Sequence, residues 1–208
     1  MPVLGQMMLS TCGTMEKTMT YQSEKQIVRD FYCALENASI SKIGRIMGQF
    51  CIPDLLWRGF HPFNEIRGCV DVGQRFWQPL RSSLTHLQRR MDIFMAGHNE
   101  IAGQEGVWVV SMGHLMGLFD KPWLGIPPTG KMALLRYCEF NKVENGMITQ
   151  SAMFFDIPHL IIQAGLQPFP PQTAAHLVQP GPMTHNGLLF EAQDFVEGQR
   201  TKEAIEFM

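Results

Sequence analysis

The segment FFDIPHLIIQAG, residues 154–165, marks the passage from a strand to a helix. An apolar run ends at Asp156, and a proline and an apolar pattern with helical spacing follow it. The pattern predicts a strand over about 147–156 and a short helix over 158–164. We expect that helix to stop at Gly165, because glycine readily adopts the left-handed conformation found at helix ends. One carboxylate therefore lies at the border of an apolar strand.

Upstream of this segment, the pattern predicts helices first and strands afterwards. The dipeptide Asn145-Gly146 predicts a tight hairpin turn into the last strand, since both residues accept a positive φ. Helices followed by a run of antiparallel strands indicate the α+β class. The remaining expected strands lie at about 85–96, 105–119 and 131–142, and the expected helices lie at about 24–37, around 43–47 and at 69–84.

Two local features refine these expectations. Ser23-Glu24-Lys25-Gln26 has the form of a capping box, so we expect Ser23 to cap the first helix. Pro53 limits the piece around it to a sheet edge or a bend. The residues around His61, Asn64 and Glu65 are predicted to form a polar loop.

Composition excludes several classes of protein. The chain has 208 residues, of which 45% are hydrophobic, so it can form one well-buried core. A formal net charge of −2 without a basic cluster predicts no nucleic-acid partner. Five cysteines without a CxxC pair indicate a reducing compartment. No segment has the pattern of a secretory signal or of a membrane span. We expect a soluble cytoplasmic protein that does not bind a membrane.

The C-terminal part differs in composition from the rest. Proline-rich stretches at 167–171 and 179–182 predict an extended arm, and 190–207 regains helical spacing. The arm's helix is expected to pack on the chain's own body, a partner subunit or a following domain. We therefore divide the chain into an N-terminal extension, a main domain, and an arm with a terminal helix, at 1–22, 23–166 and 167–208.

His114 and Asp156 are the ionisable groups best placed for chemistry. Alternation along the strand at 105–119 puts His114 on an apolar face with Trp108, Met112 and Met116. A histidine there is either a satisfied core residue or a neutral imidazole that points into a ligand cavity. Asp156 has two interpretations. As the N-cap of the helix that follows, its charge is stabilised by the amides of the first helical turn. As a general base in an apolar pocket, its pKa is raised by the loss of water around the carboxylate.

Other aromatic residues have the same ambiguity between core and pocket wall. The loop at 120–131 is an ordered connection or a cover whose Trp123 closes over a ligand. The sequence contains no nucleophile elbow, Walker loop, zinc-protease helix or dinucleotide fingerprint, and we predict no metal site. The residues predicted to bind substrate are Trp57, Phe60, His61, Phe76, Trp108, Met112, Met116, Trp123 and Phe154.

Three stretches together resemble the SnoaL-like polyketide cyclases, a branch of the nuclear-transport-factor-like superfamily with a cystatin-like fold. The first is WRGF at 57–60 with FW at 76–77 downstream. The second runs from MGH at 112–114 to GIPPTGK at 125–131. The third runs from YCEF at 137–140 through Asn145-Gly146 to Phe155-Asp156 and QAG at 163–165. The resemblance covers about residues 24–166.

The resemblance implies a cone-shaped, curved antiparallel sheet wrapped around N-terminal helices, a deep apolar pocket and a homodimer. It also implies an intramolecular aldol closure of a small apolar carbonyl compound without metal or coenzyme. Asp156 matches the family's acid and base, and His114 matches its assisting histidine, although the family's T-G-T-H-x-G reads SMGHLMG here, at 111–117. The alternatives are an isomerase or hydratase, or a non-catalytic ligand-binding or assembly module that forms half of a tandem pair.

Overall fold

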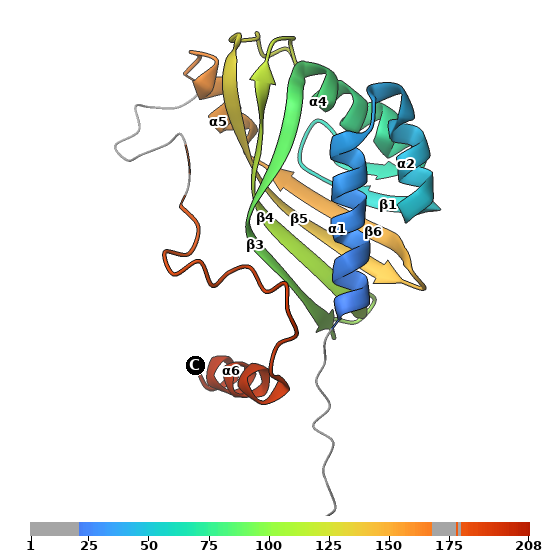
Figure 1. Cartoon of the computed structure of the whole chain (residues 1–208), viewed down its shortest axis with the longest axis vertical. Helices are drawn as coiled ribbons and strands as arrows, with labels where there is room; N and C mark the ends of the chain where they lie inside the picture. The colour runs from blue at the N-terminus through green and yellow to red at the C-terminus, as the bar shows by residue number, and fades with distance from the viewer. Residues whose placement is uncertain (1–20, 168–177, 179) are drawn as a thin grey trace, which may run out of the picture. The chain divides into compact units, whose positions relative to one another are not determined.

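The computed structural model describes residues 21–167, 178 and 180–208 (Figure 1). Contacts divide the chain into two units, one of residues 21–191 and one that includes residues 192–208. The second unit contains helix α6, Phe195–Phe207, whose first turn is capped where Asp194 Oδ1 accepts a hydrogen bond from the Val196 amide at 2.7 Å. Among the described residues, no helix is both long and apolar enough to cross a membrane.

The main unit is built on a six-stranded sheet with the order β2-β1-β6-β5-β4-β3. Every neighbouring pair is antiparallel except β1 and β6, which run parallel. The sheet is curved, and helix α1 lies across one of its faces (Figure 1). The strands are β1 Cys51–Arg58, β2 Glu65–Arg67, β3 Leu84–Asn99, β4 Gly106–Phe119, β5 Lys131–Glu144 and β6 Met147–Phe155. This architecture confirms the predicted α+β class and cone-like sheet.

Local sequence signals explain most of these strands. Asn145 and Gly146 have φ values of 50° and 80°, which confirms the predicted hairpin turn between β5 and β6. Pro53 coincides with a break in the register between β1 and β6, because proline gives the sheet no amide hydrogen. The polar-loop prediction was wrong for Glu65, which begins the short strand β2 opposite Arg58.

The helices of the main unit also begin and end close to the predicted positions. They are α1 Gln22–Asn37, η1 Ile40–Lys42, α2 Ile43–Phe50, α3 Cys69–Val72, η2 Gly73–Trp77, α4 Gln78–Ser83 and α5 Ile157–Gln163. The capping-box prediction was wrong, because α1 begins at Gln22 and Ser23 Oγ donates to Glu24 instead. Gly165, with φ 80°, follows α5 as expected.

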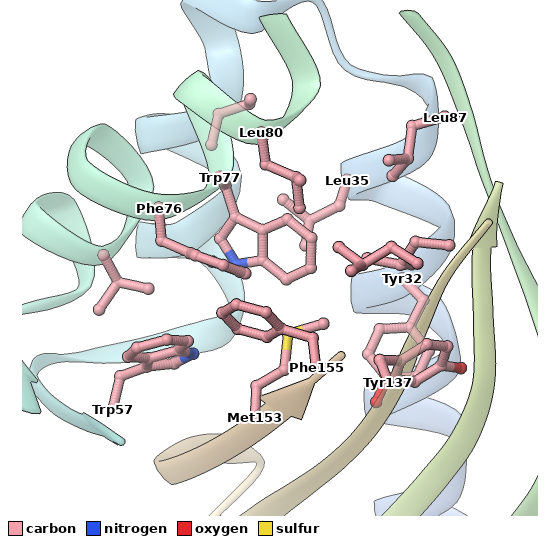
Figure 2. Close-up of a cluster of buried hydrophobic side chains, with 14 of the residues drawn as sticks. Tyr32, Leu35, Trp57, Phe76, Trp77, Leu80, Leu87, Tyr137, Met153 and Phe155 are labelled. Carbon is pink, nitrogen blue, oxygen red and sulfur yellow. The ribbon is translucent and has the colours of Figure 1, made fainter. Parts of the chain in front are cut away.

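The space between the helices and the sheet is filled by an aromatic core (Figure 2). Alternation along β5 and β6 turns Tyr137, Met153 and Phe155 toward the helices. These side chains meet Phe76 and neighbouring aromatics, and the Phe76 and Phe155 rings stack at 5.3 Å between centroids. The face of the sheet toward the helices is therefore packed, and any large cavity has to lie elsewhere.

Residues 187–191 of the arm lie beside the edge strand β3. Phe94 donates its amide hydrogen to Gly187 O at 3.0 Å, and Leu189 donates to Phe94 O at 2.7 Å. The buried ammonium of Lys25 on α1 donates to the carbonyls of Leu189 and Glu191 at 2.5 and 3.0 Å. This part of the arm covers backbone groups of an edge strand, which would otherwise be open to pairing with another chain.

Candidate functional site

A cavity of about 740 Å³ lies beside the end of β6 and the start of α5. Most of the groups that line it are apolar, and its ionisable residues are His61, Arg136, Tyr137, Cys138 and Asp156. The full lining consists of Phe60, His61, Met112, Arg136, Tyr137, Cys138, Phe154, Phe155, Asp156, Ile157, Pro158 and Ile161.

The floor of this cavity is formed by the sheet face that points away from the aromatic core. Met112, Cys138 and Phe154 lie opposite one another on β4, β5 and β6 and form one row across the sheet. Their sequence neighbours Tyr137 and Phe155 point to the core, so the row points to the other side. The resemblance implied a deep apolar pocket without stating which face of the sheet carries it, and here bulky aromatic side chains fill the space between sheet and helices.

Asp156 lines the cavity and also caps helix α5. Its Oδ1 accepts a hydrogen bond from the His159 amide at 2.9 Å, and proline at position 158 has no amide hydrogen to offer. The N-cap interpretation of Asp156 is therefore confirmed, and the general-base interpretation stays a prediction. One carboxylate oxygen is committed to the helix, and the other has no hydrogen bond to a described residue.

Arg136 is the cross-strand neighbour of Asp156. The Asp156 amide donates to Arg136 O at 3.0 Å, which continues the β5–β6 pairing by one residue. Both side chains line the cavity, yet the structure shows no ion pair between them, nor between Arg136 and any other described carboxylate. An arginine placed this way keeps its five donors available for an anionic group on a ligand.

His114 is not among the residues that line the cavity. It is 1% exposed and lies opposite Arg136 in the β4–β5 pairing, so Arg136 stands between it and Asp156. Adjacent strands are about 4.8 Å apart, which puts the His114 and Asp156 backbones about 10 Å apart. His114 Nδ1 lies 3.4 Å from Asp92 Oδ2. Burial lowers the His114 pKa below its ordinary value, although Asp92 opposes that shift.

The geometry can be compared with known structures. No family model matches the sequence, and no curated protein does. A candidate SnoaL-like polyketide cyclase from Jannaschia sp. CCS1 is similar, with 17% identity, a TM-score of 0.52, and coverage of 73% of this chain and 95% of that one. IdmH, a candidate polyketide cyclase from Streptomyces antibioticus, matches with 15% identity, a TM-score of 0.53, and coverage of 68% and 97%.

A third similar structure is a candidate polyketide cyclase from Xanthomonas campestris pv. campestris, with 18% identity, a TM-score of 0.53, and coverage of 69% and 97%. The chain has the fold of the SnoaL-like polyketide cyclases. At these identities the likeness concerns the fold alone, so it assigns no chemistry to this chain.

Of the nine residues predicted to bind substrate, four line the cavity and five do not. Phe60, His61, Met112 and Phe154 line the cavity with Asp156, and the Phe60 and Phe154 rings lie 4.9 Å apart. The others do not line it. Trp57 and Phe76 are core residues that are 1% and 0% exposed. Trp108 Nε1 donates a hydrogen bond to Gln104 O at 2.9 Å, and Met116 lies further along β4. Trp123 packs against Phe63.

Sequence reasoning missed a buried polar cluster inside the core of the SnoaL-like fold. Arg89 Nη1 lies 2.8 Å from Glu139 Oε2, and the two side chains are 4% and 1% exposed. The Arg89 guanidinium lies over the rings of Tyr32 and Tyr137, at 3.7 and 4.4 Å from their centroids. Alternation was the available signal, since Tyr137, Glu139 and Asn141 share the β5 face that points to the core.

The cluster is further tied by two neutral hydrogen bonds. Ser111 Oγ and the Tyr137 hydroxyl are 2.7 Å apart, and Asn141 Nδ2 donates to the Tyr32 hydroxyl at 3.0 Å. Burial and the Glu139 carboxylate raise the pKa of Tyr32 well above its ordinary value.

Within the part of the chain that the structure describes, no three His, Cys, Asp or Glu side chains are grouped as metal ligands.

Proposed function

We propose that this chain is a cofactor-independent acid/base catalyst of the cyclase or aldol type that acts on an apolar carbonyl compound. One observation carries the proposal: Asp156 is among the residues that line a mostly apolar cavity of about 740 Å³. A cavity of this size matches a typical small-molecule site, and apolar walls exclude the water that would compete for protons.

The proposed reaction uses Asp156 as the base. Its second carboxylate oxygen removes a proton from a carbon next to a carbonyl group, and the electron pair moves onto the carbonyl oxygen to form an enolate. The enolate carbon then attacks a second carbonyl of the folded chain, which forms a carbon–carbon bond and an alkoxide. Asp156 returns its proton to that alkoxide, so no atom or electron is left over.

Arg136 is the donor best placed to stabilise the enolate oxygen. It lies across the strand pair from Asp156 and lines the same cavity, whereas His114 pairs with Asp92 outside the lining. A hydrogen bond from a donor that is already in position becomes stronger as negative charge develops on the oxygen. We therefore assign the assisting role to Arg136, and not to the histidine that matches the family motif.

A second candidate is a non-catalytic ligand-binding module. The hydrogen bond from the His159 amide to Asp156 Oδ1 favours it, because it gives the carboxylate a structural role as the cap of helix α5. An isomerase or hydratase on this fold would share the first proton abstraction with the cyclase. The decisive question is therefore whether Asp156 removes a proton from a bound ketone.

The test measures proton exchange directly. The protein is incubated with 2-acetylnaphthalene in D₂O, and deuterium incorporation into the methyl group next to the carbonyl is followed by NMR. We expect the wild-type protein to accelerate the exchange over buffer and Asp156→Asn to abolish that acceleration. Asparagine keeps the helix cap, so the variant should fold and still bind the ketone in equilibrium dialysis.

Asp194→Asn is the matched control, since Asp194 also caps a helix but does not line the cavity. Full exchange activity in Asp156→Asn would refute the catalytic assignment. Binding of the ketone without accelerated exchange in the wild-type protein would support the ligand-binding module instead.

We also propose that the chain forms the homodimer that its resemblance implies. The exposed apolar side chains of Leu118 and Met132, which lie opposite each other on β4 and β5 outside the cavity, support this, since a second copy would shield them from water. Light scattering on the chain alone should report twice its 23.6 kDa mass. A monomeric mass at micromolar concentration would contradict the proposal.

A further inference from the structure

A second hollow, of about 580 Å³, lies between helical segments η2 and α4 and the loop that follows β4. It shares no residue with the cavity around Asp156. Its walls are held in place by the chain itself, since Ser83 Oγ donates to Pro122 O at 2.9 Å. The loop is closed by reciprocal backbone hydrogen bonds between Trp123 and Ile126, at 3.2 and 2.8 Å. Hydrogen bonds within the chain therefore fix the loop that forms one wall of the hollow.

The charge in this hollow has one sign. Arg75 and Lys121 line it, and no aspartate or glutamate does. Neither cation forms an ion pair or a hydrogen bond with another described side chain. The acidic residue next to Lys121, Asp120, instead accepts a hydrogen bond from Thr85 Oγ1 at 3.1 Å. Two cations without a partner among the described side chains favour a bound anion.

An aromatic wall accompanies the two cations. Trp123 lines the hollow, is 3% exposed and stacks on Phe63 at 6.2 Å between ring centroids. Its Nε1 is buried and has no hydrogen-bond partner among the described residues. Leu124 and Pro79 add apolar surface.

We propose that this hollow binds a small organic anion with an aromatic or apolar body. Its carboxylate lies between Arg75 and Lys121, and its body lies against Trp123. The planar fork of arginine suits the two oxygens of a carboxylate, and the mixed lining suits an amphipathic ligand better than a bare ion. The proposal is independent of the reaction assigned to Asp156.

The experiment follows the indole N–H signals of the four tryptophans by NMR, with the Trp123 signal assigned through Trp123→Phe. The probe is 2-naphthoate, the neutral control is 2-naphthamide, and the bare-ion control is inorganic phosphate. We expect 2-naphthoate to shift the Trp123 signal saturably, and phosphate to bind at least about tenfold more weakly because it lacks the apolar body. Binding should weaken as sodium chloride is added.

Two substitutions test the cations. Arg75→Gln and Lys121→Gln should each weaken 2-naphthoate binding about tenfold, because each removes a charge-assisted contact. Arg45→Gln and Lys131→Gln are the matched controls, since both residues are exposed and lie outside the hollow, and they should leave the affinity unchanged. The proposal is overturned by an unshifted Trp123 signal, by equal binding of 2-naphthamide or phosphate, or by unchanged affinity in both cation variants.

Discussion

Asp156 and Arg136 face each other across strands β6 and β5, joined by a backbone hydrogen bond of 3.0 Å but by no side-chain ion pair. Asp156 Oδ1 is held by the His159 amide, which keeps the carboxylate beside α5. The guanidinium and the second carboxylate oxygen therefore remain available on the wall of one apolar cavity. A base and a cation that do not neutralise each other are what enolate chemistry requires.

Arg136→Gln is expected to slow the exchange of deuterium into 2-acetylnaphthalene about 100-fold, because it removes the donor that stabilises the enolate oxygen. Its unfolding free energy should change by less than about 0.5 kcal/mol, since the Arg136 side chain has no ion pair or hydrogen bond with a described residue. Arg136→Lys should retain part of the activity through its charge. An unchanged rate in Arg136→Gln would show that the cation plays no part in proton abstraction.

Breaking the buried ion pair should strongly destabilise the core. Arg89→Met leaves the Glu139 carboxylate without its cation, and we expect a loss of about 3–5 kcal/mol in the free energy of unfolding. The double variant Arg89→Met/Glu139→Leu should be more stable than Arg89→Met, because it leaves no unpaired charge. Urea denaturation measures both. A double variant that is no more stable than Arg89→Met would contradict the cost assigned to the unpaired Glu139 carboxylate.

The stability of the protein should depend on His114 between neutral and mildly acidic pH. Burial lowers the His114 pKa in the folded state, so the unfolded chain takes up the proton first as the pH falls below about 6.5. The contribution of His114 is present above that pH and is lost as the pH falls through the folded-state pKa.

His114→Asn should therefore lose less unfolding free energy than the wild-type protein between pH 7.5 and pH 5.0. Urea denaturation at the two pH values provides the measurement. His98→Asn, at an exposed position of β3, is the control and should behave like the wild-type protein. If the wild-type protein and His114→Asn lost equal stability, burial of the neutral imidazole would not be the cause of the pH dependence.

Gly113→Ala is expected to destabilise the β3–β4 pair by about 1–3 kcal/mol. A Cβ at this position would collide with the carbonyl oxygen of Arg90, next to the irregular register between Met91 and Ile93. Gly97→Ala, on the neighbouring strand, has open space around its added carbon and should be neutral or slightly stabilising. Thermal unfolding compares the two variants, and equal melting temperatures would refute the steric argument.

Much of the fold could be predicted because its signals are local. Helical spacing located α1, alternation located β4 and β5, and Asn145-Gly146 located the turn before β6. The capping box failed because α1 begins one residue before the serine that was expected to cap it. The strand at Glu65 was missed because three residues are too few for alternation to show.

The candidate site was predicted less completely. The sequence alone located Asp156 at the end of a strand. The pairing of Asp156 with Arg136 could not be predicted, because it depends on the register between β5 and β6. Periodicity put His114 on the same sheet face as Met112, yet it could not show that Arg136 separates it from Asp156. The Arg89–Glu139 pair joins β3 to β5, so it appears only when the sheet is assembled.

The order and type of the elements were thus determined by the sequence itself, because spacing, turn residues and glycine act over a few residues. Tertiary structure decided which side of the sheet carries the cavity. Bulky aromatics such as Phe76 and Phe155 fill the helix side, and that outcome depends on the volumes of side chains brought together from distant segments.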